Sequence, residues 1–236
     1  MNRLLFVCAL IVLSALLNLS YRRPAQENHK PSVKIIQPLN LAAFQVGTAV
    51  SYQISVADPE DGDSKYDEIN AKEVILEVKF INENSAKKHR TGSPEPMDAP
   101  GLSVMAISNC FNCHNFNSKG IGPSFLEISK RYPATKANAD TLTARIRNGS
   151  SGIWGKEKMP SHPELSAEQI KATVQWIMKN AAVRDISYYN GLSGIIPFTA
   201  NKKGTFLLTA GYTDHGLPGE PGKNLTGFDR ISLKLK

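Results

Sequence analysis

The stretch CFNCH, residues 110–114, is the most informative part of this 236-residue chain. Two cysteines separated by two residues occur in zinc sites, in thiol–disulfide pairs and in sites of covalent haem attachment. A structural zinc ion needs four ligands, but the chain has three cysteines in all and its other four histidines are scattered. A thioredoxin-like pair is expected in a β-α-β setting, whereas this stretch follows a helical pattern. The complete C-x-x-C-H motif therefore favours covalent haem over zinc and thiol chemistry.

The spacing of the motif suits one covalently attached haem c. Cys110 and Cys113 would bond the two vinyl groups of the porphyrin, because a two-residue spacer lets both thiols reach it from one helical turn. His114, the next residue, would then project toward the iron as an axial ligand. The motif occurs once in the sequence, so we expect one haem.

The sixth iron ligand is expected to be a methionine, since a thioether raises the potential as an electron carrier requires. Met159 and Met178 follow the motif. Met178 falls within a predicted helix beside its apolar face, where core packing is the simpler interpretation. Met159 lies in a loop bounded by prolines, GKEKMPSHPEL, and is the preferred candidate. His162 in the same loop is the alternative, and a bis-histidine iron would have a lower potential.

The N-terminus has the pattern of an export signal. A positive start is followed by a 14-residue run, residues 4–17, that is apolar except for Ser14. This length suits a signal peptide and is short for a membrane span. We therefore expect residues 1–20 to be a signal peptide and the protein to be periplasmic or exported. No A-x-A cleavage site follows, so an uncleaved N-terminal membrane anchor is the alternative.

Export also agrees with the cysteine content. Cys8 lies within the apolar run and is interpreted as a small apolar residue. Only Cys110 and Cys113 then remain, which excludes a disulfide framework. Haem c is attached outside the cytoplasm, so the signal supports the interpretation of CFNCH.

Residues 98–183 carry helical patterns. Pro123 suits the first turn of one predicted helix, and Gly149 suits the end of another. Ser166 and Gln169 form a capping box at the start of the last one. Four segments are expected to be helical: 101–109, 123–132, 138–149 and 165–181.

The two flanks, residues 31–82 and 187–236, carry β patterns. Each shows about three strands, and a sandwich needs about seven. We therefore predict that the flanks complete one sandwich, with the helical region inserted between them. The alternative is a small N-terminal β domain, followed by the helical region and a separate C-terminal β extension packed on it.

The charge of the chain is +7 and unevenly distributed. Residues 31–82 carry four lysines against eight carboxylates, whereas residues 98–183 carry ten basic residues against six acidic ones. A nucleic-acid binder concentrates far more positive charge, so no nucleic-acid partner is expected. The mild positive bias of the central region fits docking to an acidic protein.

An acidic loop follows the second predicted strand. Asp58, Glu60, Asp61 and Asp63 offer the hard oxygen ligands that Ca²⁺ prefers. The loop lacks the spacing of an EF-hand, so a solvated turn is the preferred interpretation.

Residues 101–180 resemble the small bacterial class I cytochromes c. Four motifs occur in the family's order: CFNCH, GIGPSF, GSSGIWGKEKMPSHPELS and VQWI. The resemblance covers about a third of the chain. It implies an all-α fold, thioether attachment at Cys110 and Cys113, and axial ligation by His114 and Met159.

The same resemblance implies two further site residues. The carbonyl of Pro123 would accept the other ring N–H of the axial histidine, which fixes the ring. Trp154 would lie beside the haem edge; an ordinary core indole is the alternative. Trp176 is expected to pack against the helix before the cysteines.

The flanks resemble the Ig-like sandwiches called PKD domains. The matching stretches are SYQISVADPEDGD, GTFLLTAGYTDHG and ISLKLK. The predicted fold class is therefore a multidomain chain, with an all-α class I cytochrome c domain and all-β Ig/PKD-like sandwich segments. The layout resembles the electron-accepting ends of exported oxidoreductases, including quinone-dependent sugar dehydrogenases.

The leading functional hypothesis is a periplasmic single-electron carrier and not an enzyme. Its expected partners are a dehydrogenase as donor and a cytochrome or oxidase as acceptor; the oligomeric state is open. Peroxidase-like catalysis is an alternative, but it commonly needs a second haem. A module that binds a polysaccharide or envelope component through Tyr188 and Tyr189 is another.

Overall fold

A computed structural model describes residues 27–81, 100–183, 185–198, 204–220 and 223–236. The predicted signal or anchor, residues 1–20, lies outside these ranges. Among the described residues, no helix has the length and apolar character needed to cross a bilayer. Membrane tethering therefore stays a prediction about residues that the structure does not describe.

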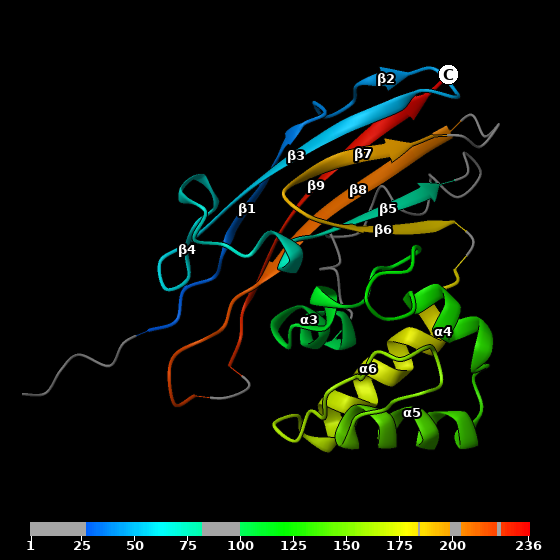
Figure 1. The fold of residues 1–236 in the computed structure, drawn as a ribbon. Helices are drawn as coiled ribbons and strands as arrows, with labels where there is room; N and C mark the ends of the chain where they lie inside the picture. The colour runs from blue at the N-terminus through cyan, green and yellow to red at the C-terminus, as the bar shows by residue number, and fades with distance from the viewer. Residues whose placement is uncertain (1–26, 82–99, 184, 199–203, 221–222) are drawn as a thin grey trace, which may run out of the picture.

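Nine strands are described, and they form two sheets (Figure 1). In the first sheet β1 and β7 both pair with β3, which also pairs with β4, and all pairs are antiparallel. The second sheet has the order β2-β9-β8-β5-β6, with β2 and β9 parallel and the other pairs antiparallel. The bounds are β1 Ser32–Gln37, β2 Ala43–Phe44, β3 Ala49–Asp58, β4 Gly62–Asp63, β5 Ile75–Ile81, β6 Ile186–Asn190, β7 Ser193–Pro197, β8 Gly204–Thr213 and β9 Thr226–Leu235.

The alternation of β3 shows why these segments form strands. Val50, Tyr52, Ile54 and Val56 are buried, and the residues between them are more exposed. Side chains of a strand alternate between the faces of a sheet, so all four point into the space between the two sheets. Strands β5, β8 and β9 supply the opposite wall of this core.

Both flanks contribute to both sheets. In the first sheet, β7 from the C-terminal flank pairs with β3, and Val50 lies opposite Ile196. In the second, β5 lies between β6 and β8. The N-terminal flank forms five strands, two of them only two residues long, instead of the expected three. The chain leaves the sheets after β5 and returns to them at β6. The domain boundaries at 31–82, 98–183 and 187–236 stay predictions.

Within residues 100–183, four α-helices are described between β5 and β6: α3 Pro100–Ile107, α4 Phe125–Arg131, α5 Lys136–Asn148 and α6 Ala167–Asn180. The predicted capping box of α6 is confirmed, because Ser166 Oγ accepts from Gln169 N and Gln169 Oε1 accepts from Ser166 N. Helix α5 ends before Gly149 as predicted, and that glycine has a φ of 78°.

The start of α4 differs from the prediction. The helix begins at Phe125 and is capped by Ser124, whose Oγ accepts from Glu127 N. Pro123 therefore precedes the cap and does not occupy the first turn. The reason is that Ser124 and Glu127 form a complete capping box, which satisfies two of the free N–H groups at this end.

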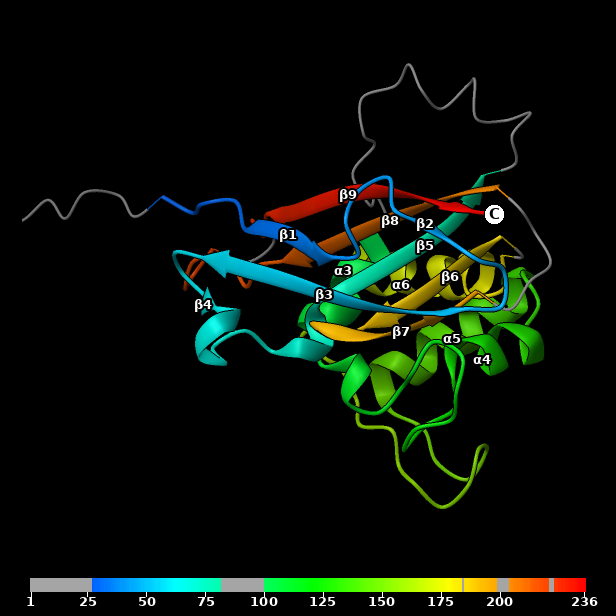
Figure 2. The same cartoon turned by 90° about the horizontal axis from the view of Figure 1, so that it is seen from above.

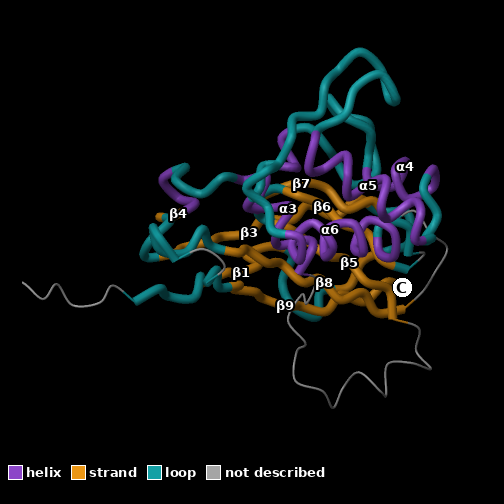
Figure 3. The backbone as a smooth tube through the Cα atoms, turned by 90° about the horizontal axis from the view of Figure 1, so that it is seen from below, coloured by secondary structure: helices purple, strands orange, loops and turns teal. Residues whose placement is uncertain are grey.

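The helices cover the face of the second sheet that points away from the first (Figures 1 and 2). Figure 3 shows the same layers from below. Adjacent residues of β6 point to opposite sides: Tyr188 packs with the helices, and Tyr189 packs toward the sandwich core. Trp176 of α6 lies against Tyr188, with ring centroids 5.2 Å apart. The helical region thus shares its core with one sheet face.

Candidate functional site

The CFNCH stretch folds as a single tight turn. Cys110–Asn112 form a 3-10 turn, and the N–H groups of Cys113 and His114 both donate to the carbonyl of Cys110, at 3.2 and 3.0 Å. Asn109 begins the turn in the left-handed region, with a φ of 60°. One turn therefore carries both thiols and the imidazole.

The two thiols are free in the structure. Burial raises the pKa of the Cys110 thiol to about 12. A thiol–disulfide pair relies on a lowered pKa at its attacking cysteine, since the thiolate is the nucleophile. The environment of Cys110 therefore argues against thiol–disulfide exchange.

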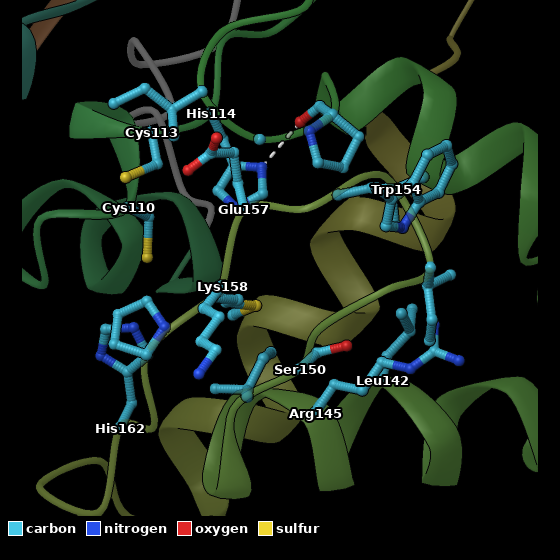
Figure 4. A pocket seen from close by; sticks show the side chains of 18 of the residues that line it. Cys110, Cys113, His114, Leu142, Arg145, Ser150, Trp154, Glu157, Lys158 and His162 are labelled. Carbon is cyan, nitrogen blue, oxygen red and sulfur yellow. Dashed lines mark hydrogen bonds between the residues drawn. The ribbon is translucent and has the colours of Figure 1, made fainter.

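The ring of His114 is held by the backbone. Its Nδ1 atom lies 2.6 Å from the carbonyl oxygen of Pro123 (Figure 4), and the side chain is buried. Burial lowers the pKa of His114, and the hydrogen bond to Pro123 opposes this. A neutral ring that donates from Nδ1 has its lone pair on Nε2, the form that ligates a metal.

Packing restricts the same ring further. Phe125 of α4 stacks on His114, with centroids 5.3 Å apart and planes inclined by 25°. A Cβ atom on Gly122 would lie 2.6 Å from His114 Cε1. The GIGP stretch thus requires glycine at 122 because the imidazole occupies the space. Sequence analysis singled out Pro123 but missed the contact with Phe125.

A largely apolar cavity of about 310 Å³ opens beside this turn. All six predicted site residues line it: Cys110, Cys113, His114, Pro123, Trp154 and Met159. Its other walls come from α3, α4, α5 and α6 and from the loop after α5. Figure 4 shows Cys110, Cys113 and His114 on one side of this cavity and Leu142 and Arg145 of α5 on another.

Two methionines of the described chain line the cavity. Met159 is half-buried, and its N–H and C=O pair with those of Ser150 at 2.8 and 3.1 Å. This pairing ties the loop to the end of α5. The second, Met105 of α3, is fully buried and was not considered from the sequence because it precedes CFNCH. Met178 packs against the helical core and is outside the cavity lining.

His162 also lines the cavity. Its Nδ1 atom lies 2.8 Å from Glu164 Oε1, and its backbone N–H donates to the carbonyl of Ile146. The backbone bond ties this part of the loop to α5 as well. His162 therefore stays a second candidate for the sixth ligand.

Trp154 lies at a rim that carries positive charge. It is half-buried, and the guanidinium of Arg131 sits 4.7 Å from its ring centroid, a cation–π distance. Arg145 lines the cavity nearby and donates to the hydroxyl of Tyr132. Two cations beside an apolar cavity suit a ligand that is apolar in its body and anionic at its edge.

The residues that line the cavity have the properties that a bound haem requires. Its walls are largely apolar, a neutral imidazole and two free thiols share one turn, and Arg145 is among the lining residues. In addition, Thr173 Oγ1 is buried beside the cavity without a hydrogen-bond partner among the described residues. Buried polar groups are usually hydrogen-bonded, so this hydroxyl is free to bond a polar atom of a ligand in the cavity.

In the described part of the chain, no group of three or more His, Cys, Asp or Glu side chains could hold a metal ion. Asp58 of the acidic loop is buried, which a solvated turn does not predict. Tyr188 is buried and Tyr189 half-buried. The pair is therefore not an exposed aromatic surface for polysaccharides, because the helices cover one ring and the sandwich core holds the other.

The helical region is similar to known cytochromes c. The family model for cytochrome c matches residues 98–181. Cytochrome c-551 of Azotobacter vinelandii is 38% identical over 78 residues, which cover 33% of this chain and 94% of that protein. Cytochrome c-552 of Hydrogenobacter thermophilus is 36% identical over 69 residues, or 29% of this chain and 69% of that protein. The crystal structure of Nitrosomonas europaea cytochrome c552 aligns with a TM-score of 0.31 and 33% identity, covering 32% of this chain and 93% of that one.

Proposed function

Because the chain belongs to the cytochrome c family, we propose that it carries one haem, ligated by His114 and Met159, and works as a single-electron carrier. Proteins of this family bind haem c covalently and exchange electrons with redox partners. The observation that carries the proposal is that both thiols of CFNCH, the imidazole of His114 and the Met159 loop border one apolar cavity.

Each residue has a defined task in this proposal. Cys110 and Cys113 hold the porphyrin through two thioether bonds, and His114 offers Nε2 because Pro123 engages Nδ1. Met159 offers a thioether from a loop that Ser150 holds in place. The bound haem iron supplies the gain and loss of one electron. The apolar walls keep water away, which together with a thioether ligand favours a raised potential.

The wider setting of this function is also proposed. Residues 1–20 direct export to the periplasm, with anchoring by the same segment as the alternative. The flanking strands form an Ig/PKD-like sandwich that carries the cytochrome region between β5 and β6. An exported dehydrogenase donates the electron, and another cytochrome or an oxidase accepts it. The positive bias of residues 98–183 supports docking to acidic partners.

The test is a pyridine-haemochrome assay combined with the intact mass of protein exported from a host that matures cytochromes c. We expect one haem per chain and a mass equal to the polypeptide plus one haem. A matched variant in which Cys110 and Cys113 are both serine should lose the covalent haem. A colourless wild-type protein with the mass of the bare polypeptide would refute the proposal.

The same material separates carrier from catalyst. A carrier with both axial positions filled should bind cyanide or CO slowly and should not consume peroxide. Rapid cyanide binding together with peroxide turnover would overturn the electron-carrier assignment while leaving the covalent haem in place.

A further inference from the structure

A second group of charged residues lies outside the lining of the haem cavity, at the end of the sandwich where β3 and β8 end. Most of its carboxylates have partners. His215 lies between two of them, with Nδ1 3.1 Å from Asp61 Oδ2 and Nε2 3.2 Å from Glu73 Oε2. Glu60 pairs with His29 at 2.7 Å, and Asp63 accepts from Lys65 N. Three of the four acidic residues that the loop sequence offered for Ca²⁺ are thus engaged elsewhere.

Asp58 and Asp214 lack such charged partners. Within the described ranges, no Lys, Arg or His forms an ion pair with either carboxylate, and their exposed fractions are 5% and 0%. Asp58 Oδ1 accepts from the N–H groups of Glu60 and Asp61, but its Oδ2 is buried without a hydrogen-bond partner. A buried ionised carboxylate is costly unless it is paired or coordinates a metal. The unpaired Oδ2 atom of Asp58 is therefore available to bind a cation.

Asn28 brings a third oxygen to the same place. Its Nδ2 donates to Asp214 Oδ2 at 3.0 Å and to the carbonyl of Lys223 at 3.1 Å. Its Oδ1 is buried and, like Asp58 Oδ2, has no partner among the described residues. Hydrogen bonds hold these segments together: His215 N, next to Asp214, donates to Asp61 Oδ2, and His29 N, next to Asn28, donates to Glu60 Oε2, while Asp61 N and Glu60 N both donate to Asp58 Oδ1. Burial raises the pKa of Asp214, and the charge of Asp58 adds to this.

We propose that Asn28, Asp58 and Asp214 bind a hard divalent cation, Ca²⁺. This ion accepts carboxylate, amide and backbone oxygens together with water, and the cluster offers two carboxylates, one amide and the carbonyl of Lys223. Only two of these ligands are acidic side chains. The proposed site is therefore not one of the groups of three or more His, Cys, Asp or Glu side chains, which the described residues do not form. Mg²⁺ demands a tighter octahedral shell, so Ca²⁺ is preferred.

The cation would join three separate segments. Asn28 precedes β1, Asp58 ends β3 and Asp214 follows β8. A shared ion therefore fixes the entry of the chain into the sandwich against the ends of two central strands. It also removes the repulsion between two buried carboxylates, so stability rather than redox chemistry should respond to it.

The experiment uses the full-length holoprotein, treated with EGTA and then titrated with CaCl₂ by calorimetry. We expect one Ca²⁺ per chain. Thermal unfolding followed by far-UV circular dichroism should shift upward by about 5–10 °C at 100 times the Kd. MgCl₂ should give a smaller shift, and the visible spectrum should not change.

Two variants and one control locate the site. Asp214 Oδ1 accepts from the N–H groups of Gly216 and Leu225, as Asp58 Oδ1 does from Glu60 and Asp61. Asp58→Asn and Asp214→Asn each keep one side-chain oxygen for these backbone contacts, and both should abolish the Ca²⁺ shift. Asp67→Asn removes an exposed charge from the same loop at a left-handed residue that asparagine tolerates, and it should leave the shift intact.

Three results would overturn the proposal. The first is a wild-type protein that gives neither heat nor a shift with CaCl₂. The second is a shift that survives in both variants, which would place binding elsewhere. The third is an Asp58→Asn variant that is more stable than wild type in EGTA, with no effect of CaCl₂ on wild type or variant. That result would mean that the carboxyl groups of Asp58 and Asp214 share a proton. If a variant does not fold, the wild-type calorimetry alone decides.

Discussion

The Nδ1 atom of His114 lies 2.6 Å from the carbonyl oxygen of Pro123, and this hydrogen bond links the CFNCH turn to the segment that starts α4. Ser124, the next residue, caps α4, and Phe125, the first residue of the helix, stacks on the imidazole. The backbone that starts a helix therefore also orients the proposed iron ligand. Both partners are buried, so water does not compete for the bond.

Gly122→Ala should disturb this arrangement. The new methyl group would lie 2.6 Å from His114 Cε1, so the ring or the loop must move. Overpacking of this kind costs about 1–3 kcal/mol. We expect a lower midpoint in chemical unfolding and an altered haem spectrum. Lys119→Ala, an exposed change in the same loop, is the control and should change neither; an unperturbed Gly122→Ala spectrum would contradict the contact.

Met159→Leu and Met105→Leu form a matched pair. Both residues line the cavity, but only Met159 is proposed to ligate the iron. Met159→Leu should abolish the weak far-red band of the oxidised protein and lower its potential. Met105→Leu conserves volume and should keep the band, with a stability change below about 1.5 kcal/mol. Loss of the band in Met105→Leu alone would move the ligand to α3.

Two single substitutions, compared with each other, test the rival ligand. If His162 ligates the iron, His162→Ala should change the wild-type spectrum, whereas Met159→Leu should not. We expect the reverse. His162→Ala should leave the far-red band of the oxidised protein in place, since Met159 remains.

His215 should make the sandwich sensitive to alkaline pH. The hydrogen bond between His215 and Glu73 is the main reason that the pKa of His215 rises from 6.5 to about 9. Because the folded pKa is above the unfolded value, the protonated ring stabilises the fold fully below about pH 6.5, and this contribution is lost as pH rises through about 9. The ring is half-exposed, so the effect is modest.

The measurement is the thermal midpoint between pH 6 and pH 10, in EGTA. His215→Gln should flatten the decline between pH 6.5 and 9.5 relative to wild type. His29→Gln is the control at the exposed pair with Glu60 and should keep the decline. Equal slopes in wild type and His215→Gln would contradict this assignment.

Tyr188→Ala should loosen the helices from the sheet. Tyr188 is buried between Phe116 and Trp176, with centroids 5.4 and 5.2 Å away, so its removal should cost about 3 kcal/mol. Hydrogen exchange should speed up at amides of α6. Tyr189→Ala, on the opposite face of the same strand, should loosen the sandwich core and leave α6 protected.

The local features of the protein were predictable from sequence. The CFNCH motif, the Ser166 capping box, the end of α5 and strand β3 depend on residues close together in the chain, and the structure has them as expected. The start of α4 was misplaced by two residues because Pro123 suggested a first turn that Ser124 caps instead.

The site could be predicted only in part. The six residues predicted for the haem site all line the cavity, but Met105 and Phe125 join it through the crossing of helices, which no local pattern encodes. The acidic loop shows the same limit. Its sequence contains four carboxylates of similar appearance, and only the fold shows that His29 and His215 engage two of them and that Asp58 stays unpaired.

The sequence by itself determined the chemistry of the attachment turn, because thiol spacing and the adjacent imidazole act within five residues. The tertiary structure alone decided which strands of the two flanks pair, such as β3 with β7, and that Asn28 meets Asp214, 186 residues away. Such contacts depend on which distant surfaces can bury each other once the loops close. That is a property of the whole chain, and no short segment contains it.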